Sequence, residues 1–254
     1  MTRVHDDARL AGVYHGGNAM PRSSLRAWAR FVSSFAPRPE PAWLDVGAGT
    51  GMFCAALDQY QPASRVVGVE PSLAMLDEAR RLPTAGGARF VAGTAERLPL
   101  VGGTFDIALL SRVVHHLPDR PAAARELARV LRPGGVVVIR TTFREQLDAV
   151  VYDYWPRLRA TDADRFPGRE EVLADFARGG FTPRTVTSFA QPVAASLGAY
   201  AVRLSDQPQS KFTRLSPAEF AAGLERMRAD AATRAGDTPR AVRERYDVAV
   251  LVRD

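Results

Sequence analysis

The chain has 254 residues, of which 46% are hydrophobic and 24% are charged, a composition typical of one large globular domain. Its formal net charge of +6 is spread along the chain without a block of like charge, which argues against nucleic acid as a partner. The start shows no apolar leader, no run of 18 apolar residues occurs, and Cys54 is the lone cysteine. These features exclude a secretory signal, a membrane span and a disulfide framework, so we expect a cytoplasmic protein without a membrane partner.

Residues 41–140 alternate short apolar strands with helices of about ten residues. The pattern predicts strands at Ala42–Val46, Arg65–Glu70, Ala88–Ala92, Phe105–Ser111 and Val136–Thr141. It predicts helices at Met52–Tyr60, Leu73–Leu82 and Pro121–Leu131. Near-continuous apolar strands joined by helices indicate a parallel sheet covered on both faces, and therefore a doubly wound α/β fold.

The C-terminal part has a different pattern. An amphipathic helix at Glu170–Arg178 stops at Gly179-Gly180, and Thr182–Phe189 alternates as a more exposed strand does. Residues 194–234 are typical of helix and loop, and Tyr246–Arg253 is a final apolar strand. This order predicts an antiparallel strand that joins the sheet after a long helical detour.

A glycine loop is the most informative motif of the chain. It reads Trp43-Leu-Asp-Val-Gly47-Ala-Gly49-Thr-Gly51-Met-Phe53, so a predicted strand leads through three glycines into a predicted helix. Glycine allows unusual backbone angles there and lets a ligand approach bare backbone. Glu70 ends the next strand, where a carboxylate accepts both ribose hydroxyls of an adenosine. The motif therefore predicts a cofactor of the nucleoside type.

The loop departs from a dinucleotide fingerprint, which needs Gly-x-Gly-x-x-Gly, because Met52 stands where the third glycine would fall. Asp45 precedes the loop, where its carboxylate would repel a pyrophosphate but could hold a ligand ammonium group. A ligand with an amino-acid tail, a ribose and a cationic sulfur suits these residues better. An NAD(P)-dependent oxidoreductase is the alternative that the loop disfavours.

Further segments occur in an order that resembles class I S-adenosylmethionine-dependent methyltransferases of the small-molecule, "type 11" subfamily related to ubiquinone and menaquinone biosynthesis enzymes. They are Glu70-Pro-Ser-Leu-Ala-Met-Leu76, Gly93-Thr-Ala-Glu-Arg-Leu-Pro99, Phe105–Ser111, Val114-His-His-Leu-Pro-Asp119 and Val130-Leu-Arg-Pro-Gly-Gly135. The resemblance covers about residues 41–141 and is looser beyond Thr141. It implies methyl transfer from S-adenosylmethionine to an O, N or C nucleophile of a small-molecule metabolite, with S-adenosylhomocysteine as product.

The resemblance also implies a role for each matching position. Asp45 with Gly47, Ala48 and Gly49 would face the methionine tail and ribose, and Glu70 would hold the ribose hydroxyls. Pro71, Met75, Thr94, Ala95 and Glu96 would surround the adenine, and Ser111 with Arg112 would underlie the sulfonium. The family often has aspartate in place of Thr94, so the backbone of Ala95 and Glu96 become the expected adenine neighbours.

The family fold is a seven-stranded, mostly parallel sheet in the order 3-2-1-4-5-7-6. We expect one methyltransferase domain over residues 1–254, with an N-terminal helical lid at 1–40 and a cofactor-binding core at 41–141. Residues 142–254 would form the substrate side, with a helical insertion at about 190–240 and a closing strand. We expect a monomer or homodimer. A protein of this fold that binds the cofactor but uses it for non-methylating chemistry remains a second alternative.

His115 and His116 follow the fourth predicted strand, beside the expected sulfonium. One interpretation is a general base that takes a proton from the acceptor. The other, which we favour because the family carries histidine here across many chemistries, is packing against the cofactor or backbone. In either case we expect His116 close to the cofactor. The remaining histidines are far away in sequence, so no metal site is expected.

Several segments outside the core are candidates for the rest of the site. Tyr14 with Arg22 resembles a pairing that closes related enzymes over the methionine end, although an ordinary surface helix fits equally well. The aromatic cluster Tyr152, Tyr154 and Trp155 is interpreted as part of the acceptor pocket, and Ser210-Lys211-Phe212 as a solvated loop. Arg22, Arg26 and Arg30 could form a row at helical spacing that meets an anionic acceptor.

Overall fold

The computed structural model describes residues 20–61, 65–81, 87–205, 210–234 and 240–254. The seven strands of these segments form one sheet in the order β3-β2-β1-β4-β5-β7-β6. The strands are β1 (Ala42–Val46), β2 (Arg65–Glu70), β3 (Arg89–Ala92), β4 (Phe105–Ser111), β5 (Leu131–Thr141), β6 (Phe181–Ala194) and β7 (Val242–Arg253). Strands β1 to β5 pair in parallel, and β7 pairs antiparallel to both β5 and β6. The predicted fold class and strand order are confirmed.

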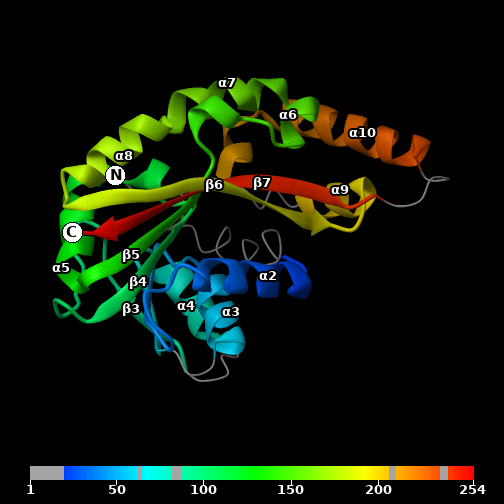
Figure 1. The fold of residues 1–254 in the computed structure, drawn as a ribbon. Coiled ribbons are helices and arrows are strands. Elements are labelled where there is room, and N and C mark those ends of the chain that lie inside the picture. Colours follow the sequence, from blue (N-terminus) through cyan, green and yellow to red (C-terminus); the bar gives the residue numbers. More distant parts are fainter. Residues whose placement is uncertain (1–19, 62–64, 82–86, 206–209, 235–239) are drawn as a thin grey trace.

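Helices cover both faces of the sheet, as Figure 1 shows. On one face lie α2 (Arg22–Ser33), α3 (Met52–Tyr60) and α4 (Leu73–Arg81). On the other lie α5 (Arg120–Val130) and α8 (Arg169–Ala177). The β-branched and leucine-rich strands are buried between these layers, since β4 is buried from Phe105 to Leu110 and β5 from Gly135 to Thr141. The sheet therefore holds the carboxyl ends of β1, β2 and β4 in fixed positions.

A second layer of helices covers the outer parts of β6 and β7. It contains α6 (Val151–Tyr154), α7 (Pro156–Arg165), α9 (Leu197–Leu204), α10 (Pro217–Thr233) and the short helix η4 (Ser210–Arg214). These helices share a hydrophobic cluster of their own, which includes Trp155, Tyr200, Phe212 and Met227. We call this unit, with the outer ends of β6 and β7, the cap. Two further short helices, η2 (Val114–His116) and η3 (Arg144–Gln146), follow β4 and β5.

Helix α2 is the described part of the expected N-terminal lid. Trp28, Ala29 and Val32 are buried in a cluster with Trp43 of β1 and Val250 of β7, so this helix packs on a face of the sheet. Residues 1–19 lie outside the described residues, and the lid remains a prediction. Among the described residues, no helix combines the length and apolar character that crossing a membrane requires.

Candidate cofactor and acceptor site

The glycine loop connects β1 to α3 at the carboxyl edge of the sheet. Gly47, Gly49 and Gly51 all adopt positive φ angles, of 71°, 56° and 79°. A Cβ atom at Gly47 would lie 2.5 Å from a Val113 methyl, and one at Gly51 would lie 2.8 Å from the Phe90 ring. A Cβ atom at Gly49 would meet no described atom within 4 Å. Two of the glycines are thus required by packing, whereas the third leaves space beside bare backbone.

Glu70 reaches this loop from the end of the neighbouring strand β2. Its Oε2 accepts a hydrogen bond from the Gly49 N–H at 2.9 Å, and its Oε1 accepts one from the Ser72 N–H at 2.9 Å. Strands β1 and β2 are in parallel register, which brings Val46 beside Val69 and the two strand ends together. The carboxylate is therefore fixed against the loop.

Asp45 lies beneath the loop and is 1% exposed. The Cys54 thiol donates to its Oδ2 at 3.4 Å, while Oδ1 has no hydrogen-bond partner among the described residues. Burial raises the pKa of Asp45 to about 7, the Cys54 hydrogen bond opposes that rise, and the charge of Glu70 adds to it. An orphaned carboxylate oxygen in such a place is costly unless a donor reaches it. Cys54 itself is buried, which raises its pKa well above the usual value and makes it an inert thiol.

The segment after β3 supplies the other residues expected near an adenine. The Gly93 N–H donates to the Glu70 carbonyl at 3.3 Å, which ties this turn to the end of β2. Ala95 is buried, and Glu96 Oε1 is a second buried oxygen without a partner in the described structure. Met75 of α4 is also buried, and Pro71 is half-buried. The predicted adenine residues therefore follow two adjacent strands.

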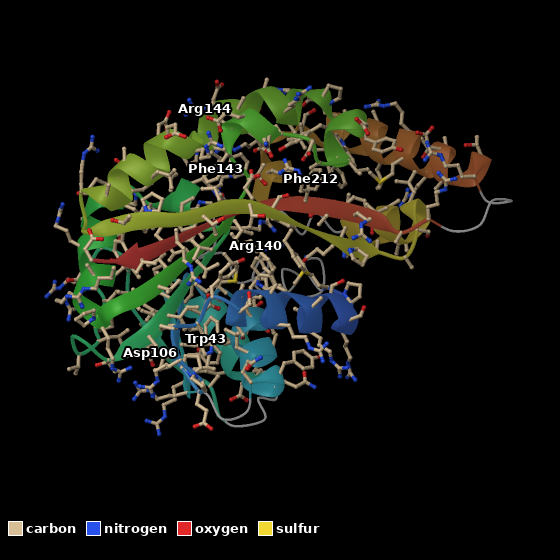
Figure 2. The ribbon with its side chains drawn as sticks, viewed as in Figure 1. Trp43, Asp106, Arg140, Phe143, Arg144 and Phe212 are labelled. Atoms are coloured by element: carbon tan, nitrogen blue, oxygen red, sulfur yellow. The ribbon has the colours of Figure 1, made fainter. Side chains whose placement is uncertain are left out.

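Ser111 ends β4, next to β1 in the sheet, and Arg112 follows it. The Arg112 backbone has a φ of 60°, a left-handed angle that is uncommon outside glycine. The Arg112 N–H donates to the Arg140 carbonyl at 2.7 Å, and Arg140 Nη1 donates to Ser111 Oγ at 3.1 Å. Arg140 is buried on the α2 side of the sheet, 3.4 Å from the centre of the Tyr246 ring (Figure 2). The chain thus turns sharply where β4 leaves the sheet.

A cleft lies between these strand ends and the cap. Its walls come from β4 and η2, from α6 and α7, from η4, and from β7. The lining residues are Arg112, His115, His116, Thr142, Asp148, Ala149, Tyr152, Asp162, Arg165, Phe166, Lys211, Glu244, Arg245 and Tyr246. Such a position, outside the carboxyl ends of parallel strands, is where ligands bind in open α/β sheets.

The two adjacent histidines differ in environment. His115 packs edge-on against Phe166 with ring centres 4.5 Å apart, and its Nδ1 is buried without a partner among the described residues. Burial is the main cause that holds the pKa of His115 well below its usual range, and the charges of His116, Arg165 and Arg112 add to the effect. His116 is exposed on the same short helix, and an Arg165 Nη atom lies 3.0 Å from its ring nitrogens.

Other residues proposed from the sequence have different surroundings than expected. Tyr152 lines the cleft, but Trp155 and Tyr154 belong to the hydrophobic cluster of the cap. Trp155 stacks on Phe220 and donates to its carbonyl at 3.2 Å, so it holds α10 in place. All three belong to the cap cluster, and Tyr152 also lines the cleft, whereas Tyr154 and Trp155 form hydrogen bonds to α10, so a place for these two in the acceptor pocket remains a prediction.

The interpretation of residues 210–212 as a solvated loop is wrong. The Lys211 side chain is 14% exposed and lines the cleft, and Phe212 is fully buried on the cap side of the sheet (Figure 2). The arginines Arg22, Arg26 and Arg30 are exposed on α2, and Arg26 lies over the Tyr60 ring at the far end of α3. Tyr14 lies outside the described residues, so its pairing with Arg22 remains a prediction.

Comparison with known proteins identifies the family. A family model described as a methyltransferase domain matches residues 44–139, which span the glycine loop through β5. Demethylmenaquinone methyltransferase of Staphylococcus aureus is 30% identical over 174 residues, covering 60% of this chain and 72% of that protein. The chain belongs to the class I S-adenosylmethionine-dependent methyltransferases.

A second curated relative and a solved structure are also similar to this chain. Demethylmenaquinone methyltransferase of Roseiflexus castenholzii is 33% identical over 152 residues, covering 58% of this chain and 63% of that protein. A solved putative methyltransferase from an antibiotic biosynthesis pathway of Anabaena variabilis has the same fold, with a TM-score of 0.64 and 19% identity over 89% of this chain and 98% of that one. The chain spans about half the length of several other curated relatives that it matches.

Proposed function

We propose that this chain transfers a methyl group from S-adenosylmethionine to a small-molecule acceptor bound in the cleft. The observation that carries the proposal is the loop beside Gly49, where open space, a fixed carboxylate at Glu70 and an orphaned carboxylate oxygen at Asp45 adjoin one another. The amino-acid tail and ribose of the family's methyl donor carry the donors that these acceptors need. The residues present therefore fit the ligand that the family uses.

In this proposal Asp45 Oδ1 accepts from the ammonium of the methionine tail, and Glu70 accepts from the ribose hydroxyls. Glu96 Oε1, buried and without a described partner, accepts from the adenine amino group, while the Ala95 backbone and Met75 border the ring. Ser111 and Arg112 underlie the sulfonium end. Each assignment follows from the strand on which the residue stands, since the four segments meet at one edge of the sheet.

The bound donor supplies an already electrophilic methyl carbon, so the protein needs chiefly to orient the acceptor and keep water out. The cap provides for both, because its hydrophobic cluster covers the cleft and its polar side chains face into it. His115 is neutral at pH 7 and presents an unpartnered ring nitrogen. Its low basicity suits it to holding an acceptor hydroxyl or amine more than to removing a proton. We therefore assign His115 an orienting role, and His116 with Arg165 the rim of the cleft.

Calorimetry tests the cofactor site directly. We expect S-adenosylhomocysteine to bind one-to-one and NAD or NADP to give no binding heat. Absence of S-adenosylhomocysteine binding by a folded sample would overturn the proposal. Incorporation of labelled methyl from S-adenosylmethionine into a metabolite extract then tests catalysis. Binding without any incorporation would instead favour a member of this fold with non-methylating chemistry.

A further inference from the structure

Four cationic side chains from separate elements line the cleft, together with the carboxylates Asp148, Asp162 and Glu244. Arg112 follows β4, Arg165 ends α7, Lys211 lies on η4 and Arg245 lies on β7. Side chains from four elements converge here only because the cap folds back over the strand ends. Since lysine and arginine are rarely buried without a purpose, the charges of the cleft indicate what it binds.

One of these cations is already neutralised by the protein. Arg245 donates to Asp148 at 3.0 Å and to Asp247 at 2.8 Å, so two carboxylates share its charge. Lys211 is different. Its Nζ lies 3.8 Å from Asp162 Oδ2, which is too far for a hydrogen bond, and that oxygen accepts from the Tyr152 hydroxyl at 2.8 Å. Among the described residues, no carboxylate oxygen is within hydrogen-bonding distance of the Lys211 ammonium.

The other acid that acts on Lys211 accepts hydrogen bonds from two tyrosine hydroxyls. Glu244 Oε1 accepts from the Tyr200 hydroxyl at 2.7 Å, and Oε2 accepts from the Tyr246 hydroxyl. The negative charges of Asp162 and Glu244 raise the pKa of Lys211 against the dominant effect of burial, which lowers it. Their effect is to help keep the ammonium charged while its N–H groups remain available to a ligand.

We propose that the methyl acceptor carries an oxyanion, a carboxylate or a phosphate, that binds Lys211 together with Arg112 and Arg165 in this cleft. The inference rests on the proposed function, because it assigns the cleft to the acceptor. Arg112 stands at the boundary with the cofactor site, directly after Ser111, and its left-handed backbone carries the chain from the sheet into the cleft wall. An oxyanion bound by Arg112 and Lys211 lies between the proposed cofactor site and the cap.

Lys211 is the only lysine of the chain, which allows a site-specific test. Pyridoxal 5′-phosphate is an aldehyde that carries a phosphate, and pyridoxal is the matched aldehyde without it. The Lys211 amine attacks the aldehyde carbon and water leaves. Borohydride then delivers hydride to that carbon, a proton from water completes the secondary amine, and the modified peptide is quantified by mass spectrometry. The α-amino group of the chain serves as internal reference for both aldehydes.

We expect pyridoxal 5′-phosphate to modify Lys211 at least about tenfold faster than pyridoxal, relative to the reference amine, because charge-assisted contacts with the arginines hold its phosphate in the cleft. Arg165→Gln should reduce that preference, measured as the ratio of the two rates, because a change in the basicity of the Lys211 amine affects both aldehydes alike. Equal rates for the two aldehydes at Lys211 in the folded protein would overturn the proposal.

Competition distinguishes the two oxyanions. Stronger protection of Lys211 by inorganic phosphate assigns a phosphate-bearing acceptor, and stronger protection by acetate assigns a carboxylate. Protection by neither would contradict an oxyanion site. The proposed function fails separately, through loss of S-adenosylhomocysteine binding in calorimetry, which labelling of Lys211 does not report.

Discussion

At the scale of single residues, the surroundings of Asp45 disfavour its charged carboxylate unless a ligand donates to it. Its buried carboxylate has one oxygen without a described partner and a pKa of about 7, against an ordinary value of 3.8. An acid whose pKa is raised on folding stabilises the protein fully below the unfolded value, and that contribution is lost as pH rises through the folded value. Asp45 should therefore destabilise the ligand-free protein increasingly between about pH 4 and pH 7.

Asp45→Asn should raise the melting temperature at pH 8 and change it much less at pH 5. The same change should weaken S-adenosylhomocysteine binding about 10- to 100-fold at pH 8, because an amide cannot pair with the ammonium as a carboxylate does. Thermal scans at both pH values and calorimetry measure the two effects. Asp77→Asn, on the exposed side of α4, is the control and should alter neither. An equal gain in stability at pH 5 and pH 8 would contradict the titration of Asp45.

The residues at strand ends were predictable from the sequence, because an apolar run followed by Asp45 or Glu70 fixes their place on a parallel sheet. Lys211 was not. Its burial depends on Asp162 and Tyr152, which lie about 50 residues earlier, and no local pattern encodes that contact. Only the composition could have drawn attention to Lys211, because it is the one lysine among the 34 lysine and arginine residues of the chain.

At the scale of elements, the glycine loop separates a structural requirement from a binding requirement. Gly49→Ala should fold with a cost of about 1 to 2 kcal/mol from its left-handed backbone, and should weaken S-adenosylhomocysteine binding by filling the space beside the loop. Gly47→Ala bears the same strain and adds a clash with Val113 at 2.5 Å, so it should lose a further 1 to 3 kcal/mol or so. Urea unfolding and calorimetry separate the two. Undiminished affinity for S-adenosylhomocysteine in Gly49→Ala would show that the ligand does not approach the Gly49 Cα.

Strands β1 to β5 agree with the sequence pattern except at their ends, whereas β6 and β7 are longer than the sequence suggested. Three of the four residues added to β7 are charged, and those added to β6 include Gln191 and Pro192, so neither extension shows a regular apolar alternation. The two strands stabilise each other through a long antiparallel ladder, with register shifts at Pro183/Thr185 and Pro192/Ala194, in which Gln191 pairs with Glu244. Pairing between segments that are remote in sequence supplied the regular structure that local preference did not.

At the scale of the whole molecule, the sheet and the cap have separate hydrophobic cores with the cleft between them. The cap core is sensitive at Gly223 of α10, where an added Cβ would lie 2.0 Å from Trp155 Nε1. Gly223→Ala should therefore displace α10 and reduce methyl transfer by tenfold or more by our order-of-magnitude estimate, while the affinity for S-adenosylhomocysteine changes by less than about twofold.

Labelled-methyl incorporation and calorimetry on the same preparation measure the two quantities. Gly198→Ala on α9 is the matched control, because its Cβ would meet ordinary contacts at 3.8 Å and should leave both unchanged. Parallel loss of cofactor affinity and turnover in Gly223→Ala would show that the two cores do not act independently.

The pairing of Ala194 with Val242 has a consequence for how such a protein can change its specificity. The chain leaves the sheet after Ala194 and returns at Val242, so the segment between them begins and ends at one pair of neighbouring residues. That stretch carries Lys211 and seven of the sixteen buried residues of the cap core, whereas every residue assigned to the methyl donor precedes it. A foreign segment joined at this pair of residues would inherit an intact donor site and would replace the wall that carries Lys211, while the rest of the cleft lining stays in place.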